Sequence, residues 1–346
     1  MNGPRIEDIG PDDPRFADWH AAVARSYAHE RQPGWWESLE SARISFARPG
    51  TQKRRVALVA TRDGVVVGGA VLGLPLDVDV DVETVSVELG VLPDARRSGV
   101  GGALLSAVRE LAASEGRDVV QAEVFVPVDR SPEEWPGARF AESHGLRCVN
   151  VEHRFLLDVP LPEPRLRELA AAAEQGSSRD NTVVSWVGGC PEQHLEQWAR
   201  MQTQMNQDVP TGELTVTARQ VDAERVRDSD RRMAEQGWTK VRSMALDADG
   251  AGRGYTELLV SEHDPDVVVQ DDAWVDETHR GRRLGMRLKI ANLRRLQGHD
   301  DGALLGPRRR VQTYCEQDNT AMRRINAEVG FRAVDTLRGY EGPVGG

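Results

Sequence analysis

The stretch LGVLPDARRSGVGGALL, residues 89–105, combines a run of apolar residues with a segment rich in Gly and Arg. The stretch WVDETHRGRRLGMRLK, residues 274–289, has the same layout. Each predicts the end of a strand, a loop, and an amphipathic helix. Glycines let a backbone approach a ligand closely, and the first N–H groups of a helix attract anions. The chain is therefore predicted to contain two anion-binding loops.

The wider sequence predicts a duplicated domain. Glu88, Arg96 and Gly101 recur at the same spacing as Asp272, Arg280 and Gly285, and GLRCV (145–149) recurs nearly at that offset as GFRAV (330–334). The Pro- and Ala-rich segment between the halves has the composition of a linker. We expect an N-terminal domain over residues 1–160, a linker over residues 161–181 and a C-terminal domain over residues 182–346.

Both halves show the same order of patterns. In the first half, two β-branched runs around Asp63-Gly64 predict a hairpin, and a strand, the Gly-rich loop and a helix over about 99–113 follow. In the second half, VVVQDDAWV (267–275) predicts the strand before the loop. The predicted fold class is α/β (α+β): two tandem domains, each a mixed, mostly antiparallel sheet flanked by helices.

Composition narrows the functional class. The 346 residues carry a formal net charge of −11, and 39% are hydrophobic. This acidity argues against a nucleic-acid partner, and no apolar run is long enough to predict a membrane span. Cys148, Cys190 and Cys315 show neither metal-ligand nor disulfide spacing. We expect a cytoplasmic protein with no metal, no nucleic acid and no membrane partner; its oligomeric state is left open.

The loop motif indicates which anion is bound. Neither copy ends in the Gly-Lys-Ser/Thr of a Walker loop, and the first copy lacks the third Gly of the dinucleotide fingerprint. Arg-x-x-Gly-x-Gly after a strand that ends Val-x-Pro resembles the GNAT superfamily of acyl-CoA-dependent N-acyltransferases. In that family the loop binds the pyrophosphate of coenzyme A, and the preceding strand pairs with the pantetheine arm. Arg283 replaces the first Gly in the second copy.

The resemblance extends over nearly the whole chain. MNQDVPTGELTV and NTAMRRINAEVGF are similar to segments of the tandem actinobacterial, mycothiol synthase-like group. This resemblance implies acetyl-CoA as the cofactor and a small-molecule amine as the acceptor. The alternative function is that of a non-catalytic acyl-CoA-binding sensor or interaction module. The implied cofactor-binding residues are Leu89, Val91, Arg96, Arg97, Ser98, Gly99, Val100, Gly101, Gly102, Val275, Arg280, Gly281, Arg282, Arg283, Leu284, Gly285, Met286 and Asn319.

Glu88 and Asp272 are candidate general bases. A protonated amine must lose a proton before it attacks a thioester, and each carboxylate lies on the strand that leads into its loop. Each could instead attract the ammonium group, or be a solvated strand charge. Asp271 is a close rival of Asp272.

Other candidates are weaker. Many GNAT enzymes carry a tyrosine acid in the last helix, but the matching positions hold Ala141 and Asn326. Tyr314 could act near the site, although packing is the simpler role. Asp208 could bind a cationic substrate, whereas a Pro-Gly turn is the structural alternative. Because the second half keeps Asn319, we expect it to be the catalytic half.

Overall fold

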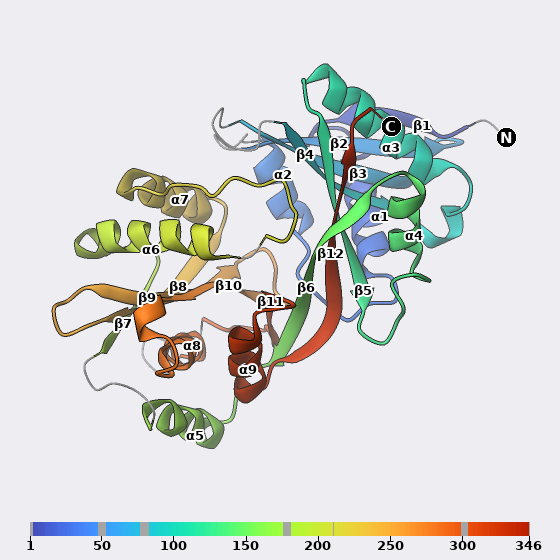
Figure 1. Cartoon of the computed structure of the whole chain (residues 1–346). Helices are drawn as coiled ribbons and strands as arrows, with labels where there is room; N and C mark the ends of the chain where they lie inside the picture. The colour runs from blue at the N-terminus through green and yellow to red at the C-terminus, as the bar shows by residue number, and fades with distance from the viewer. Residues whose placement is uncertain are drawn as a thin grey trace. The chain divides into compact units, whose positions relative to one another are not determined.

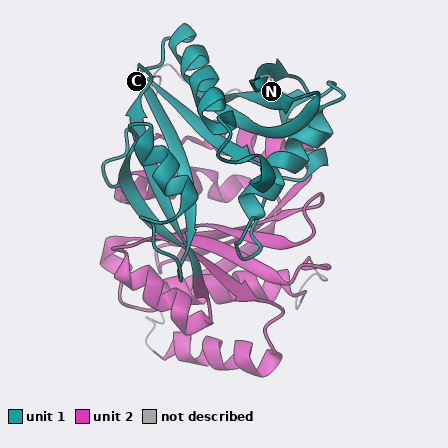
Figure 2. Ribbon diagram, turned by 90° about the vertical axis from the view of Figure 1, so that its right-hand side faces the viewer, with its two compact units in different colours: residues 1–153, 211–217, 334–346 teal, residues 154–210, 218–333 magenta. Residues whose placement is uncertain are grey.

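The computed structural model describes residues 3–47, 53–76, 83–175, 181–209, 211–298 and 304–345. The chain divides into two compact units whose segments alternate along the sequence (Figure 2). Unit 1 comprises residues 1–153, 211–217 and 334–346, and unit 2 comprises residues 154–210 and 218–333. Residues 176–180 of the expected linker lie outside the described residues.

Figure 1 labels the elements along the chain. Unit 1 contains β1 (Arg5–Ile9), α1 (Phe16–Ala28), α2 (Leu39–Ala47), β2 (Lys53–Arg62), β3 (Val65–Pro75), β4 (Thr84–Val91), η1 (Pro93–Ala95), α3 (Val100–Ser114), β5 (Val119–Pro127) and α4 (Pro136–Ser143). Unit 2 contains α5 (Glu163–Glu174), β7 (Thr182–Val187), η2 (Glu192–His194), α6 (Leu195–Asp208), α7 (Ala223–Glu235), β8 (Trp238–Leu246), β9 (Gly252–Ser261), β10 (Val267–Val275), η3 (Glu277–His279), α8 (Leu284–Leu296), β11 (Arg310–Glu316) and α9 (Thr320–Val329). Strands β6 (Arg147–Asp158) and β12 (Arg332–Pro343) have residues in both units.

The element order confirms the duplicated pattern. The series from β2 to α4 recurs element by element from β8 to α9, and β1 and β7 each pair antiparallel with the next strand. Strand β1 was not predicted from the sequence. The predicted hairpin at Asp63-Gly64 is present, and both residues have the positive φ of a two-residue turn.

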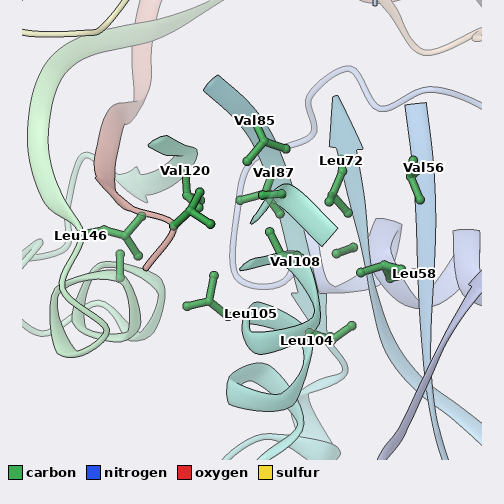
Figure 3. Close-up of a cluster of buried hydrophobic side chains, with 14 of the residues drawn as sticks. Val56, Leu58, Leu72, Val85, Val87, Leu104, Leu105, Val108, Val120 and Leu146 are labelled. Atoms are coloured by element: carbon green, nitrogen blue, oxygen red, sulfur yellow. The ribbon is translucent and has the colours of Figure 1, made fainter. Parts of the chain in front are cut away.

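The helix that follows each Gly-rich loop packs on one face of its own unit's sheet. In unit 1, the apolar side chains of α3 face those of β2, β3 and β4 (Figure 3). Val85 and Val87 are buried in this cluster, and the intervening side chains of β4 point to the other face, as strand alternation requires. The core therefore fixes the end of β4, the loop and the start of α3 relative to one another.

The strands on either side of each helix separate after a short parallel ladder. Strand β4 pairs in parallel with β5 only over Thr84–Val87, although β4 continues to Val91. Strand β10 pairs in parallel with β11 only over Val267–Val269, although β10 continues to Val275. In each unit, the strand end that leads into the loop is thus free of its parallel neighbour.

The last strand of each half, β6 or β12, has residues in both units, so the units do not follow the domain boundaries predicted along the chain. Residues Asp335–Pro343 of β12 pair antiparallel with β5 inside unit 1, and Tyr340 is fully buried there. In unit 2, the N–H of Val159 donates to Arg309 O after the end of β6. Because β12 completes the ladder beside β5, residues 334–346 belong to unit 1, whereas we expected them to lie within a C-terminal domain of residues 182–346.

Among the residues that the structure describes, no helix is both long enough and apolar enough to cross a bilayer.

Candidate active site

The two Gly-rich loops have the same backbone conformation. Arg97 and Gly281 hold equivalent positions and have φ of 59° and 78°. Gly99 and Arg283 are a second equivalent pair with positive φ, at 84° and 55°. Arg283 therefore adopts the left-handed conformation that Gly99 adopts at lower cost, and its guanidinium pairs with Glu328 on α9 at 2.7 Å.

The first arginine of each motif stabilises the loop. Arg96 Nε donates to Val91 O at 3.1 Å, and Arg280 Nε donates to Val275 O at 3.0 Å. Each guanidinium thus ties the loop back to the end of its strand. Arg97 of the first loop and Arg282 of the second loop are exposed. Arg280 is exposed as well, but it pairs with Asp208 at 2.9 Å. In the first loop, Arg62 also bonds to the hydroxyl and the carbonyl of Ser98.

Both loops lead into helices whose first turn has no side-chain cap. This holds for α3, which starts after Gly99, and for α8, which starts after Arg283. By contrast, Asn319 caps α9 by accepting a hydrogen bond from the Met322 N–H at 3.1 Å. The uncapped N–H groups of α3 and α8 are available to an anion.

Glycines and buried side chains leave the backbone at the start of α3 and α8 accessible to a ligand. A Cβ atom on Gly101 would lie 3.1 Å from the Phe140 ring, and one on Gly285 would lie 3.3 Å from Ile325, so both glycines also allow close helix packing. A Cβ atom on Gly102 would only touch His144. The side chains of Val100, Leu284 and Met286 are buried; these residues can meet a ligand only through their backbone.

A β-bulge lies in β10 at the two candidate acids. Gln270 pairs with Leu258 and Ala273 pairs with Thr256, so Asp271 and Asp272 together oppose Glu257 on β9. In a regular strand two neighbours point to opposite faces, whereas a bulge turns two residues of one strand toward a single partner. The carbonyl of Asp272 is held by Thr256 Oγ1 at 2.9 Å and by Gln270 Nε2 at 3.2 Å.

The carboxylates at the bulge have raised pKa values. Desolvation by the surrounding protein, followed by the charge of Glu257, raises the pKa of Asp272 to about 6, and a hydrogen bond from Tyr255 opposes this rise. Asp271 is accessible to solvent, but the protein around it and the charge of Asp272 raise its pKa well above its usual range. A carboxylate whose pKa lies near neutrality is suited to proton transfer.

The structure also contains a buried ionic network on the face of the sheet that carries Glu257, and this network was not predicted from the sequence. Arg242 bonds to Asp230 at 2.8 Å and also to Glu257, while Lys240 bonds to Asp230 at 3.0 Å. The Arg242 guanidinium also lies over the Trp198 ring, 4.7 Å from its centroid. Alternating charges at 240 and 242 in β8 and at 257 in β9 were the available signal, since alternate residues of paired strands share a face.

Unit 1 holds the corresponding acid in a different setting. Glu88 opposes Val71, and the β3–β4 register runs without a shift from Gly68 to Gly73. The strand is therefore regular at Glu88 and presents one acid to that face. Desolvation raises the pKa of Glu88, partly opposed by the charges of Arg55 and Lys53.

The structure gives Asp208 partners of its own. Trp274 Nε1 and Arg280 Nη2 donate to its Oδ2 at 2.8 and 2.9 Å, and Gln204 Nε2 donates to Oδ1 at 2.9 Å. Asp208 therefore connects the end of α6 to the strand and loop that precede α8. The NQDVPTG segment does not lie in one unit. Asp208 belongs to unit 2, whereas Thr211 and Gly212 belong to unit 1, and Pro210 lies outside the described residues.

Two further candidates lie on β11. Tyr314 is half-buried near the end of this strand. Cys315 is 3% exposed and packs within the core of unit 2.

Comparison with known proteins gives consistent results. The "Acetyltransferase (GNAT) family" model matches residues 17–135. A "Mycothiol acetyltransferase" from Actinosynnema mirum is 27% identical over 284 residues, which cover 82% of each chain. A solved tandem GNAT protein from the clavulanic acid biosynthesis pathway has a TM-score of 0.78 at 23% identity and covers 99% of both chains. A GCN5-related N-acetyltransferase from Sphaerobacter thermophilus has a TM-score of 0.65 at 16% identity and covers 99% of this chain and 96% of that one.

Proposed function

Because this chain is an acyl-CoA-dependent N-acyltransferase of the tandem GNAT type, we propose that it transfers an acetyl group from acetyl-CoA to a primary amine of a small molecule. We further propose that the reaction takes place in unit 2. The observation that carries this assignment is the bulge in β10, which turns Asp271 and Asp272 toward one face. Strand β4 of unit 1 has no register shift at Glu88.

The loop residues of unit 2 fit the phosphates of the cofactor. Arg282 is exposed, and the first N–H groups of α8 have no side-chain cap, so both favour an anion at this helix start. The free end of β10, from Gln270 to Val275, supports an extended arm beside it. When bound, acetyl-CoA supplies the thioester carbonyl that the amine attacks.

Asp272 is the proposed base. At pH 7 a carboxylate with a pKa of about 6 is mostly ionised and can accept the proton of an ammonium group. The charge of the ionised Asp272 carboxylate would also attract a cationic acceptor. The extra residue of a bulge has backbone groups outside the regular ladder, and an N–H there would stabilise the oxyanion.

Unit 1 supports a second, narrower role, namely binding of acyl-CoA without turnover. Its loop has the same backbone conformation as the loop of unit 2, and its helix start is also uncapped. Its strand β4 is regular at Glu88 and does not turn a second acid of the same strand toward that face. The acid near Glu88 is Glu123 on β5, whose pKa is raised by desolvation and by the charge of Glu88.

The test compares Asp272→Asn with Glu88→Gln as the matched control. Each variant is incubated with acetyl-CoA and a panel of primary amines, and the released thiol is measured. We expect Asp272→Asn to lower kcat/KM by roughly 10²- to 10⁴-fold, with a smaller loss at high pH where free amine is abundant. Glu88→Gln should keep its activity. Loss of activity in Glu88→Gln alone would assign catalysis to unit 1, and absence of acetylation across the panel would exclude the amine class.

A further inference from the structure

Tyr255 lies beside the proposed base but cannot reach a substrate. Its side chain on β9 is fully buried. The ring packs on Trp198 of α6 with the centroids 4.7 Å apart, and Tyr255 directly opposes Trp274 in the β9–β10 ladder. The residue is thus held on three sides, by α6, by its own strand and by the end of β10.

The hydroxyl of the buried Tyr255 side chain is directed at the bulge in β10. Tyr255 Oη donates to Asp272 Oδ2 at 2.8 Å. A hydroxyl that donates to an ionised carboxylate forms a charge-assisted bond, which is stronger and more directional than a neutral one. Since Thr256 and Gln270 hold the Asp272 carbonyl, both the backbone and the side chain of Asp272 are restrained.

We propose that Tyr255 is the positioning residue of the base: its hydroxyl orients the Asp272 carboxylate and keeps it ionised, so that Oδ1 is left to accept the proton of the amine. This inference rests on the proposed role of Asp272. Because Tyr255 is buried, it acts through Asp272 and does not contact the acceptor or the thioester.

The charges around Asp272 explain why such a donor is needed. Asp271 on the same strand and Glu257 on β9 disfavour a negative charge on Asp272. Lys240 and Arg242 on β8 favour it, but both are also engaged by Asp230 of α7. The Tyr255 hydroxyl bonds directly to the carboxylate, and this bond lowers the pKa of Asp272. Removing the hydroxyl should therefore raise that pKa.

The test is the pH dependence of kcat/KM for Tyr255→Phe, measured from pH 5 to pH 10 with acetyl-CoA and an accepted amine. A hydrogen bond to a charged group is worth about one to two pKa units. We therefore expect the acid limb of the profile to move up by about one to two pH units, while the plateau at high pH falls by less than about tenfold. Thermal melting verifies that the variant is folded.

Tyr340→Phe is the matched control. Tyr340 is also fully buried and its hydroxyl also donates to a carboxylate, Glu142 at 3.2 Å, but within unit 1. Its profile should coincide with that of the unmodified enzyme. An acid limb that stays in place in Tyr255→Phe, while Asp272→Asn removes activity, would overturn the inference and leave the proposed base intact. Full activity with an unchanged acid limb in Asp272→Asn would instead overturn the proposed role of Asp272 as the base, and this inference with it.

Discussion

Gly99 and Arg283 show how far one residue can depart from a motif without changing the backbone. A left-handed conformation costs a non-glycine residue roughly 1–2 kcal/mol. Arg283 adopts it with φ of 55°, and its ion pair with Glu328 offsets part of that cost. The replacement of Gly by Arg therefore leaves the second loop in the conformation of the first.

Asp272 should lower the stability of the protein at neutral pH. Its pKa is raised from 3.8 to about 6 in the folded state, so folding is favoured while the carboxyl is protonated. That contribution is fully present below about pH 4 and is lost as the pH rises through about 6. Asp272→Asn removes the charge and keeps an acceptor for Tyr255. We expect a higher melting temperature than that of the unmodified protein at pH 8, with the difference shrinking as the pH falls toward 4.

Asp247→Asn supplies the control of opposite sign. A hydrogen bond from Arg253 lowers the pKa of Asp247, so the stability it contributes is present above its usual pKa and is lost as the pH falls. This variant should melt lower at pH 8. A melting temperature of Asp272→Asn below that of the unmodified protein at pH 8 would contradict the destabilising role assigned to the Asp272 charge.

At the scale of elements, each strand–loop–helix segment uses two arginines of its loop for different roles. Arg96 and Arg280 bond to carbonyls at the ends of β4 and β10, which shapes the loops. Arg97 and Arg282 remain exposed on the loops. The charge that a pyrophosphate meets should therefore come from the exposed pair and from the helix N-termini.

Charge reversal of these exposed arginines tests this division. Arg282→Glu should weaken coenzyme A binding in unit 2, and Arg97→Glu should weaken it in unit 1. Bringing a like charge near a phosphate in water costs about 1 kcal/mol or more, so a loss of roughly tenfold in affinity is expected. Titration calorimetry on each single variant and on the double variant gives the affinity and the number of sites.

Because both side chains are exposed, neither substitution should alter the melting temperature by more than about a degree or two. Unchanged binding in the double variant would contradict the assignment of the pyrophosphate to these loops. Loss of only one of two sites in each single variant would show that both units bind the cofactor.

At the scale of the whole molecule, the end of the chain completes the unit formed by its beginning. Asp335–Pro343 supply the ladder beside β5, and Asp335 forms a buried ion pair with Arg31 at 2.9 Å. Tyr340 is fully buried in the same core as α3. Unit 1 therefore depends on residues encoded more than three hundred positions after its first strand.

Removing residues 334–346 should unfold unit 1 preferentially. The deletion exposes one edge of β5, empties the place of Tyr340 in the core and leaves the buried Arg31 charge without Asp335. Hydrogen exchange should then show loss of protection in α3 and β5, while α8 and β9 keep theirs. Deletion of only Gly345 and Gly346 is the control and should leave the exchange pattern unchanged. Protection of β5 in the longer deletion would contradict the dependence of unit 1 on β12.

The local features of this protein could be predicted from its sequence. Apolar periodicity and glycine placement predicted the strands β4 and β10, the two loops and the helices α3 and α8. The Asp63-Gly64 turn and the Asn319 cap follow from residue type. These features depend on interactions between residues a few positions apart, and such interactions are specified by the order of side chains along the chain.

The arrangement around the candidate base could not be predicted in the same way. The bulge that pairs Asp271 with Asp272, the hydrogen bond from Tyr255 and the partners of Asp208 all depend on strand register and on helices that meet across the fold. A shift of one residue in register reverses which side chains share a face. Burial then sets the pKa of each carboxyl, because desolvation depends on every element packed around it. The assignment of β12 to unit 1 has the same origin, since an open strand edge accepts any partner that the rest of the fold brings to it.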